Sequence, residues 1–206
     1  MSVDKTIEEM SLDGGSVCFD FVNTVPSRTE SPQRDYLKTY TDLLILCERT
    51  EMLSENRLDT LSKFAASNKP KARHALREMK KNRNILYHFF SKIAAKKLVD
   101  KKLLDSFNKL LAEALSNIRM VGAGTSVERG WNESEISLME PMWRIVKSGY
   151  DMLTKHPAER IKECEACGWI FLDQSKNRSR RWCNMQTCGS AHKAKKYYHR
   201  KKKKKS

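Results

Sequence analysis

The stretch CEACGWIFLDQSKNRSRRWCNMQTCGSAHKAKKYYHR, residues Cys164–Arg200, contains four cysteines in the pattern C-x2-C, fifteen residues, C-x4-C. A tetrahedral zinc site needs four thiolate or imidazole ligands, and a C-x2-C turn places two sulfurs on one side of the ion. We therefore predict one structural Zn²⁺. The site is closed, without catalytic chemistry, and its four ligands are Cys164, Cys167, Cys183 and Cys188.

Two other interpretations of these cysteines stay open. Two disulfides would use the same four residues, although a reducing compartment and the isolated Cys18 and Cys47 favour metal. His192 lies near the second pair and could replace Cys188 as a ligand. Cys18 and Cys47 fall among apolar positions, so we expect them to be inert residues of the core.

The residues around the cysteines predict a small treble-clef-like zinc finger. Residues 169–172 are apolar and residues 180–182 follow a Ser-Lys-Asn-Arg-Ser turn, which predicts a hairpin between these two segments. A helix is expected from about Thr187 through Tyr197. The metal supplies folding free energy on the order of 10 kcal/mol in such modules. Its removal is therefore expected to unfold residues 160–206 and to leave the rest of the chain intact.

Positive charge is concentrated in the same region. The 206 residues carry a net charge of +15, and residues 160–206 hold 15 Lys and Arg against 3 acidic residues, a balance of +12. This asymmetry predicts a polyanionic partner, with DNA as the first expectation. A solvated basic face, a solubilising lysine tail or a docking surface for an acidic protein would give the same pattern. The residues expected to contact nucleic acid are Lys176, Arg178, Arg180, Arg181, Lys193, Lys195, Lys196 and Arg200.

The preceding residues, 1–156, predict one mainly α domain that is separate from the finger at 160–206. Gly14–Thr24 is expected to form a turn leading into a short strand, and residues 118–131 a β-hairpin. Apolar residues at helical spacing predict the remaining elements. Their expected boundary residues are Asp35, Ser54 and Asp100 as caps, Pro70 at a helix start, Ser134 at the start of the last helix, and His156-Pro157 at its end. Pro141 lies within that last pattern and is expected either to kink the helix or to mark its true start.

Several classes of protein are excluded by what the chain lacks. It has no run of about 18 apolar residues, and its acidic N-terminus has no apolar signal core, so we expect a cytoplasmic protein without membrane contact. The five histidines are dispersed, and neither a nucleophile motif nor a phosphate-binding glycine loop is present. An enzyme is therefore not expected.

The motifs C-x-x-C-G-W-x-F-x-D, R-R-W-C-x-M and C-G resemble the CGNR-type zinc finger. The segments GGSVCFDFVNT and DYLKTYTDLLILCE are similar to the opening of the ABATE domain, which precedes that finger in its family. The resemblance implies a bacterial transcription regulator with a helical body and a C-terminal finger that binds DNA. One departure is clear. Ser190-Ala191 stands where the family has Asn-Arg, so an arginine contact is lost or its role passes to Lys193.

The same resemblance suggests that the body senses a small, unknown ligand. Asp20, Asn23 and Thr24 match the opening motif, and Arg83 matches, more loosely, an arginine of the long central helix. Polar residues in an apolar segment either satisfy neighbouring backbone groups or line a pocket. Both interpretations stay open for these four residues.

The leading hypothesis is a DNA-binding transcription regulator. An RNA- or ribosome-associated zinc protein, and an adaptor whose finger docks an acidic protein, are the alternatives. A homodimer would suit a palindromic DNA site, although no coiled-coil heptad supports it.

Overall fold

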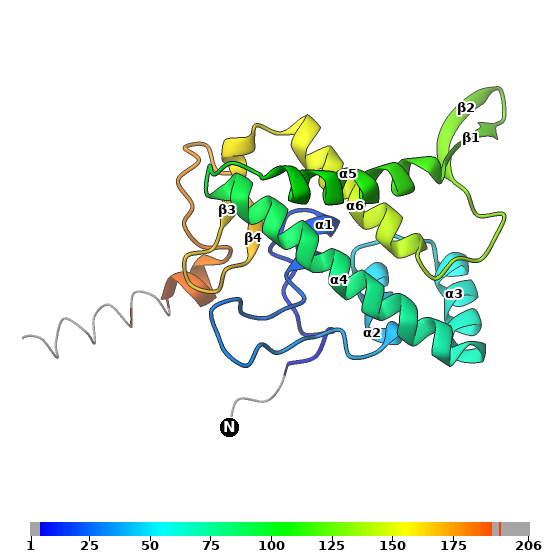
Figure 1. Cartoon of the computed structure of the whole chain (residues 1–206), viewed down its shortest axis with the longest axis horizontal. Coiled ribbons are helices and arrows are strands. Elements are labelled where there is room, and N and C mark those ends of the chain that lie inside the picture. Colours follow the sequence, from blue (N-terminus) through cyan, green and yellow to red (C-terminus); the bar gives the residue numbers. More distant parts are fainter. Residues whose placement is uncertain (1–4, 191–193, 195–206) are drawn as a thin grey trace, which may run out of the picture.

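A helix of 26 residues, α4 (Lys69–Ala94), runs through the middle of the molecule (Figure 1). The structure is a computed structural model that describes residues 5–190 and Ala194. Helices α1, α2, α3 and α5 and strands β3 and β4 all pack against α4. Its buried face, from Ala72 to Phe90, follows the helical spacing of apolar residues. One long helix therefore connects the body to the cysteine segment.

The described residues are mainly helical with two small antiparallel hairpins, which confirms the predicted fold class. The elements in chain order are α1 (Val17–Val22), α2 (Tyr40–Arg49), α3 (Glu55–Ser67), α4, α5 (Lys101–Ser116), β1 (Ile118–Ala123), β2 (Ser126–Trp131), α6 (Glu140–Lys155), η1 (Ala158–Arg160), β3 (Ile161–Glu163), β4 (Ile170–Leu172) and η2 (Met185–Gly189).

Most helix starts lie where the sequence predicts them. The hydroxyl of Ser54 accepts a hydrogen bond from the Arg57 backbone at the start of α3, and Asp100 caps α5 in the same way. Pro70 and Pro141 occupy the first turns of α4 and α6, where a missing N–H costs nothing. The hairpin at 118–131 is confirmed as β1–β2.

Three predictions for the body are wrong. The last helix does not begin at Ser134, because α6 begins at Glu140 with Pro141 in its first turn, which is the alternative start that the sequence leaves open. Residues 17–22 form helix α1 rather than a strand, because the Ser16 hydroxyl caps the Phe19 N–H at 3.2 Å and so starts a helical turn. Asp35 does not cap α2. That helix begins at Tyr40 with a capping box formed by Thr39 and Asp42, and the Asp35 carboxylate binds Arg83 instead.

One hydrophobic cluster contains side chains from both halves of the chain. Phe19 of α1 packs edge-on against Phe90 of α4, with ring centroids 4.9 Å apart. Ile170 and Phe171 of β4 are fully buried in the same cluster. The β3–β4 hairpin is thus attached to the body through apolar contacts, and the division of the chain near residues 156–160 stays a prediction.

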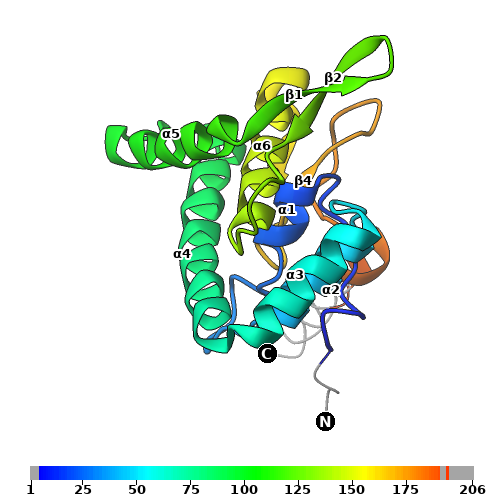
Figure 2. The ribbon, with the colours of Figure 1, turned by 90° about the vertical axis from the view of Figure 1, so that its right-hand side faces the viewer.

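The two hairpins lie at opposite ends of the molecule (Figure 1). Figure 2 shows α5 crossing the end of α4, and β1–β2 extending away from the helices. Within the described part of the chain, no helix is both long and apolar enough to span a membrane.

Candidate metal centre

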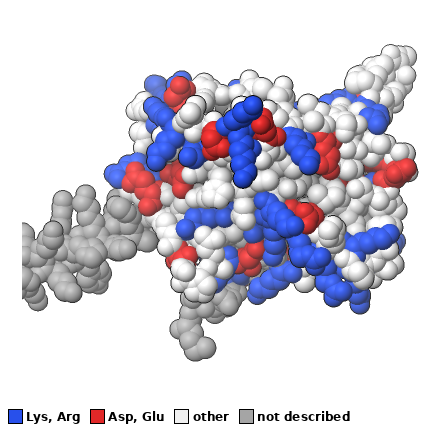
Figure 3. All heavy atoms as spheres, in the orientation of Figure 1, with Lys and Arg blue, Asp and Glu red and all other residues white. Residues whose placement is uncertain are grey.

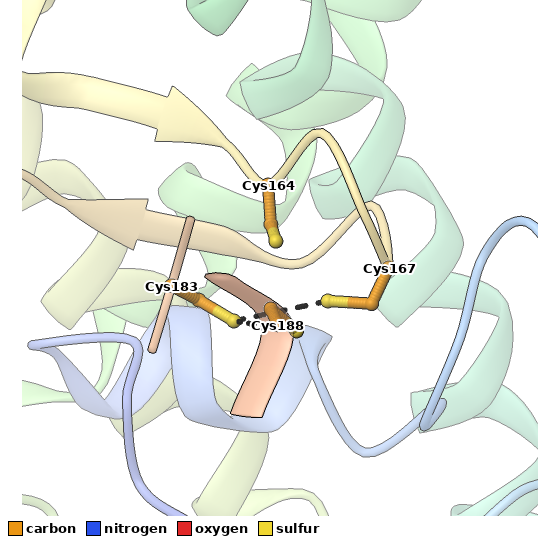
Figure 4. Close-up of side chains that lie close together, drawn as sticks. All are labelled: Cys164, Cys167, Cys183 and Cys188. Carbon is orange, nitrogen blue, oxygen red and sulfur yellow. Dashed lines mark hydrogen bonds between the residues drawn. The ribbon is translucent and has the colours of Figure 1, made fainter. Parts of the chain in front are cut away.

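The sulfur atoms of the four predicted ligands converge on one point (Figure 4). The Sγ atoms of Cys164, Cys167, Cys183 and Cys188 all lie within 4.8 Å of one another. The distance from Cys183 Sγ is 3.7 Å to Cys167 Sγ and 3.8 Å to Cys188 Sγ. Cys164 and Cys183 are buried, while Cys167 and Cys188 are partly exposed. The ligand set predicted from spacing is therefore assembled in space.

This arrangement fits a tetrahedral metal ion. With metal–sulfur bonds of about 2.3 Å, the edges of a sulfur tetrahedron are about 3.8 Å long, which matches the distances from Cys183 Sγ to Cys167 Sγ and Cys188 Sγ. Hydrogen bonds from the thiols of Cys167 and Cys183 lower the pKa of Cys164. The pKa values of Cys167 and Cys183 are in turn raised, first by their hydrogen bonds with Cys164. A bound dication would lower the pKa of all four thiols, because its charge would stabilise the four thiolates together.

The first two ligands lie on a tight turn between β3 and β4. The Cys164 N–H donates to the Trp169 carbonyl at 2.8 Å, and the Gly168 N–H donates to the Cys164 carbonyl at 2.9 Å. Gly168 has a φ of +76°, and a Cβ atom there would lie 2.7 Å from Cβ of Arg28. Only glycine meets both requirements, the left-handed backbone and the close approach of a neighbouring loop.

The second pair of ligands is held by Asn184. Its side-chain oxygen accepts hydrogen bonds from the backbone of Gln186 and Thr187, and so caps η2, the turn that carries Cys188. Its amide also donates to Asp13 at 3.2 Å. The helical turn begins at Met185, two residues earlier than predicted. Its expected continuation to Tyr197 lies outside the described residues, apart from Ala194.

The predicted pairing of 169–172 with 180–182 is wrong, because β4 pairs with β3 on the other side of the C-x2-C turn. Asp173 explains why. Its carboxylate accepts hydrogen bonds from the backbone N–H groups of Ser175 and Arg180, at 3.0 and 2.9 Å. These bonds close residues 174–181 into a loop, so that 180–182 cannot run alongside β4. We call residues 174–181 the basic loop.

The four cations of the basic loop fall into two pairs. The Arg180 guanidinium donates to the Cys183 carbonyl and lies 4.9 Å over the Phe171 ring, and Arg181 makes a bidentate pair with Glu165. Lys176 and Arg178 are exposed, and among the described residues their side chains have no ion-pair partner. The other predicted contacts, Lys193, Lys195, Lys196 and Arg200, lie outside the described residues.

The metal centre is fastened to the body by groups of the segment 23–28. The Asn23 side chain makes two buried hydrogen bonds to Ile170, accepting from its N–H at 2.9 Å and donating to its carbonyl at 2.8 Å. The Trp169 indole donates to the Val25 carbonyl at 2.8 Å, and the Arg28 N–H donates to the Cys167 carbonyl at the same distance. The sequence alone did not predict that Trp169 and Arg28 hold the finger to the body. A tryptophan next to a C-x2-C motif could have indicated a buried anchor there.

Each of the four candidate pocket residues has a partner within the protein. Arg83 donates to the Thr24 hydroxyl at 2.6 Å and to both carboxylate oxygens of Asp35, at 2.8 and 2.7 Å. The Asp20 carboxylate accepts from the Gly14 N–H at 2.9 Å. Asp20, Asn23 and Thr24 therefore form hydrogen bonds with neighbouring backbone groups, which accounts for their burial. A role of the four residues in ligand binding stays a prediction.

Asp20 makes the stability of the body depend on pH. Burial raises the pKa of Asp20 to about 7, against an opposing hydrogen bond from Gly14, whereas the ordinary value is about 3.9. Between these values the folded state binds the proton more tightly than the unfolded state, so stability falls as pH rises and levels off above pH 7.

We expect Asp20→Asn to lose this part of the pH dependence and to be more stable than the unmodified protein at pH 8. An asparagine oxygen can still accept from Gly14 but carries no charge. Urea unfolding at pH 5, 6.5 and 8 measures the effect. Equal slopes of stability against pH in the two proteins would show that Asp20 ionises normally.

A helical body joined to a four-cysteine metal centre is the architecture of a zinc-finger protein. The chain belongs to the ABATE family, whose model matches residues 15–156 and is described as "Putative stress-induced transcription regulator". The CGNR zinc finger matches residues 160–201. No curated protein matches the chain significantly. Both matched families are regulatory or metal-binding rather than enzymatic, and they confirm the domain order predicted from the motifs.

Proposed function

We propose that this protein is a DNA-binding transcription regulator whose finger holds one Zn²⁺ through Cys164, Cys167, Cys183 and Cys188. The ion supplies structure rather than chemistry, because four protein ligands leave no open position for a substrate. It ties the C-x2-C turn, which carries Cys164 and Cys167, to η2, which carries Cys188. In the cytoplasm, the protein would be associated with the nucleoid when bound.

One observation carries this proposal: the basic loop is anchored to the body, and two of its cations are exposed. Asn23, Trp169 and Arg28 fix the C-x2-C turn to the body. The carboxylate of Asp173 holds the basic loop closed through its two backbone hydrogen bonds, and Lys176 and Arg178 stay exposed. A loop with an ordered backbone and projecting cations suits a phosphate backbone, since the loop itself loses little entropy on binding.

Arg180 and Arg181 contribute differently in this proposal. Their guanidinium groups hold the loop and the C-x2-C turn together, so replacing them would disturb the finger itself. We therefore assign phosphate contact among the described residues to Lys176 and Arg178. Lys193, Lys195, Lys196 and Arg200 remain proposed contacts from the sequence.

We expect strongly salt-dependent DNA binding. Neutralising six phosphates gives a slope of about −5 in log affinity against log salt, which is a loss of about a thousandfold from 50 to 200 mM. The double variant Lys176→Glu with Arg178→Glu should weaken binding and reduce the slope by about 2. Fluorescence anisotropy with a DNA site selected from a random pool, using the full zinc-loaded chain, measures both effects.

Lys109→Glu with Arg129→Glu is the matched control, because it makes the same change in charge on exposed positions of α5 and β2. It should bind DNA with a slope close to that of the unmodified protein. Loss of the selected DNA to excess RNA would instead favour an RNA-associated protein. Binding that is independent of salt would favour an adaptor. The stoichiometry of the complex tests the predicted homodimer.

A further inference from the structure

A groove of about 620 Å³ lies between α2, α3 and the N-terminal half of α4. Its floor is apolar and includes Leu44 of α2, Ala65 of α3, and Ala72 and Leu76 of α4. Volumes of about 300–1,000 Å³ with mainly apolar walls are typical of sites for small molecules. The groove is separate from the metal centre, and none of the four candidate pocket residues lines it.

The rim of the groove is strongly cationic. Five basic residues and no acidic residue line the groove; they are Lys38, Lys69, Arg73, Arg77 and Lys80. Lys80 pairs with Asp35 at 3.1 Å. Within the described ranges, the other four have no ion-pair partner. In Figure 3, Lys and Arg side chains gather over the N-terminal half of α4. The rim therefore carries four cationic side chains that form no ion pair with any described residue.

These charges are placed where they cost stability. Lys69, Arg73 and Arg77 follow one another at intervals of four residues on α4, so like charges face each other along the helix. The first turn of α4 contains no acidic residue, and Asn68 makes no side-chain capping bond there. The positive end of the helix dipole thus adds to the repulsion rather than offsetting it. A bound anion would relieve both effects.

We propose that this groove binds a small amphipathic anion. Its carboxylate or phosphate group lies among the cations of the rim, and its apolar part lies on the floor formed by Leu44 and Leu76. The concave apolar floor argues against a nucleic-acid backbone, which offers charge and sugar along its length but little apolar surface. An acidic peptide would extend beyond a groove of this volume. The site is independent of the proposed DNA binding.

Binding of 1-anilinonaphthalene-8-sulfonate, an anionic aromatic dye, to the full zinc-loaded chain tests this proposal. We expect the dye to bind and to be displaced by decanoate, but not by decyltrimethylammonium, which has the same tail and the opposite charge. Arg73→Glu with Arg77→Glu should weaken dye binding by at least about tenfold, because two attractions become repulsions. Lys109→Glu with Arg129→Glu should leave the dye affinity unchanged.

A second variant separates the shape of the groove from its charge. Ala66 is exposed on α3 and lines the groove, so Ala66→Trp fills it and leaves every cation in place. This variant should also lose the dye, while circular dichroism shows an unchanged helical content. The proposal is overturned by full dye affinity in the Arg73 and Arg77 double variant. Displacement by both decyl compounds alike, or by duplex DNA in preference to decanoate, would overturn it as well.

Discussion

Replacing Cys164 and Cys183 together by serine is expected to abolish metal binding, from one zinc per chain to near zero. These are the two buried ligands, one from each side of the centre, so no remaining pair can close a tetrahedron. Zinc contributes on the order of 10 kcal/mol to the folding of small structural sites. That figure is as large as the whole stability of a typical domain. Elemental analysis of the purified variant measures the stoichiometry.

The same variant shows how far the structure depends on the metal. We expect loss of amide-exchange protection in residues 160–190 and in the segment 23–28 that is hydrogen-bonded to them. Helices α2, α3 and α5 should stay protected, since they make few contacts with the finger. Loss of protection throughout would contradict the predicted division of the chain into two domains.

Cys47→Ala is the control for thiol loss. Cys47 is fully buried in the core, far from the four ligands in the sequence, and burial raises the pKa of its thiol. This variant should keep one zinc per chain and lose only a little stability from a small cavity. Full zinc content in the Cys164 and Cys183 double variant would contradict the four-cysteine site.

The second large effect is expected from Asn23→Ala, which should lower the free energy of unfolding by about 2–5 kcal/mol. The side chain of Asn23 is 1% exposed, and it satisfies both the N–H and the carbonyl of Ile170. Alanine leaves two backbone groups unpaired where water cannot reach them. Urea unfolding of the zinc-loaded protein measures the loss.

Asn117→Ala provides the matched comparison. Its side chain also donates to a backbone carbonyl, that of Glu113, but this bond is exposed, so water can replace it. We expect a change within about 0.5 kcal/mol. If the two asparagine variants lost equal stability, the buried bonds between Asn23 and Ile170 would not hold the finger to the body.

Features that depend on neighbouring residues could be predicted from the sequence. Ser54 and Asp100 cap helices through N–H groups three residues away, and Pro70 and Pro141 mark first turns. The cluster of four cysteines could also be predicted, because C-x2-C and C-x4-C place sulfurs locally and four cysteines leave few alternatives. Local geometry is sufficient in both cases.

The errors arose where a hydrogen-bond partner that the spacing of residues does not reveal decides the outcome. The carboxylate of Asp173 decides the path of residues 174–181, so β4 pairs with β3 and not with the returning segment. The sequence predicts Asp35 as a helix cap, but its carboxylate accepts hydrogen bonds from Arg83, 48 residues away. Spacing alone cannot show which of two partners a charged group will bind.

By itself, the sequence determined which four cysteines cluster, the order of the two matched families and the concentration of positive charge at the C-terminal end. Only the tertiary structure decided how the finger is held, because Asn23 and Ile170 lie 147 residues apart. It alone revealed the groove, whose lining comes from three helices and the loop before α2. The physical reason is that hydrogen bonds and cavities join residues by distance in space, which periodicity along the chain does not encode.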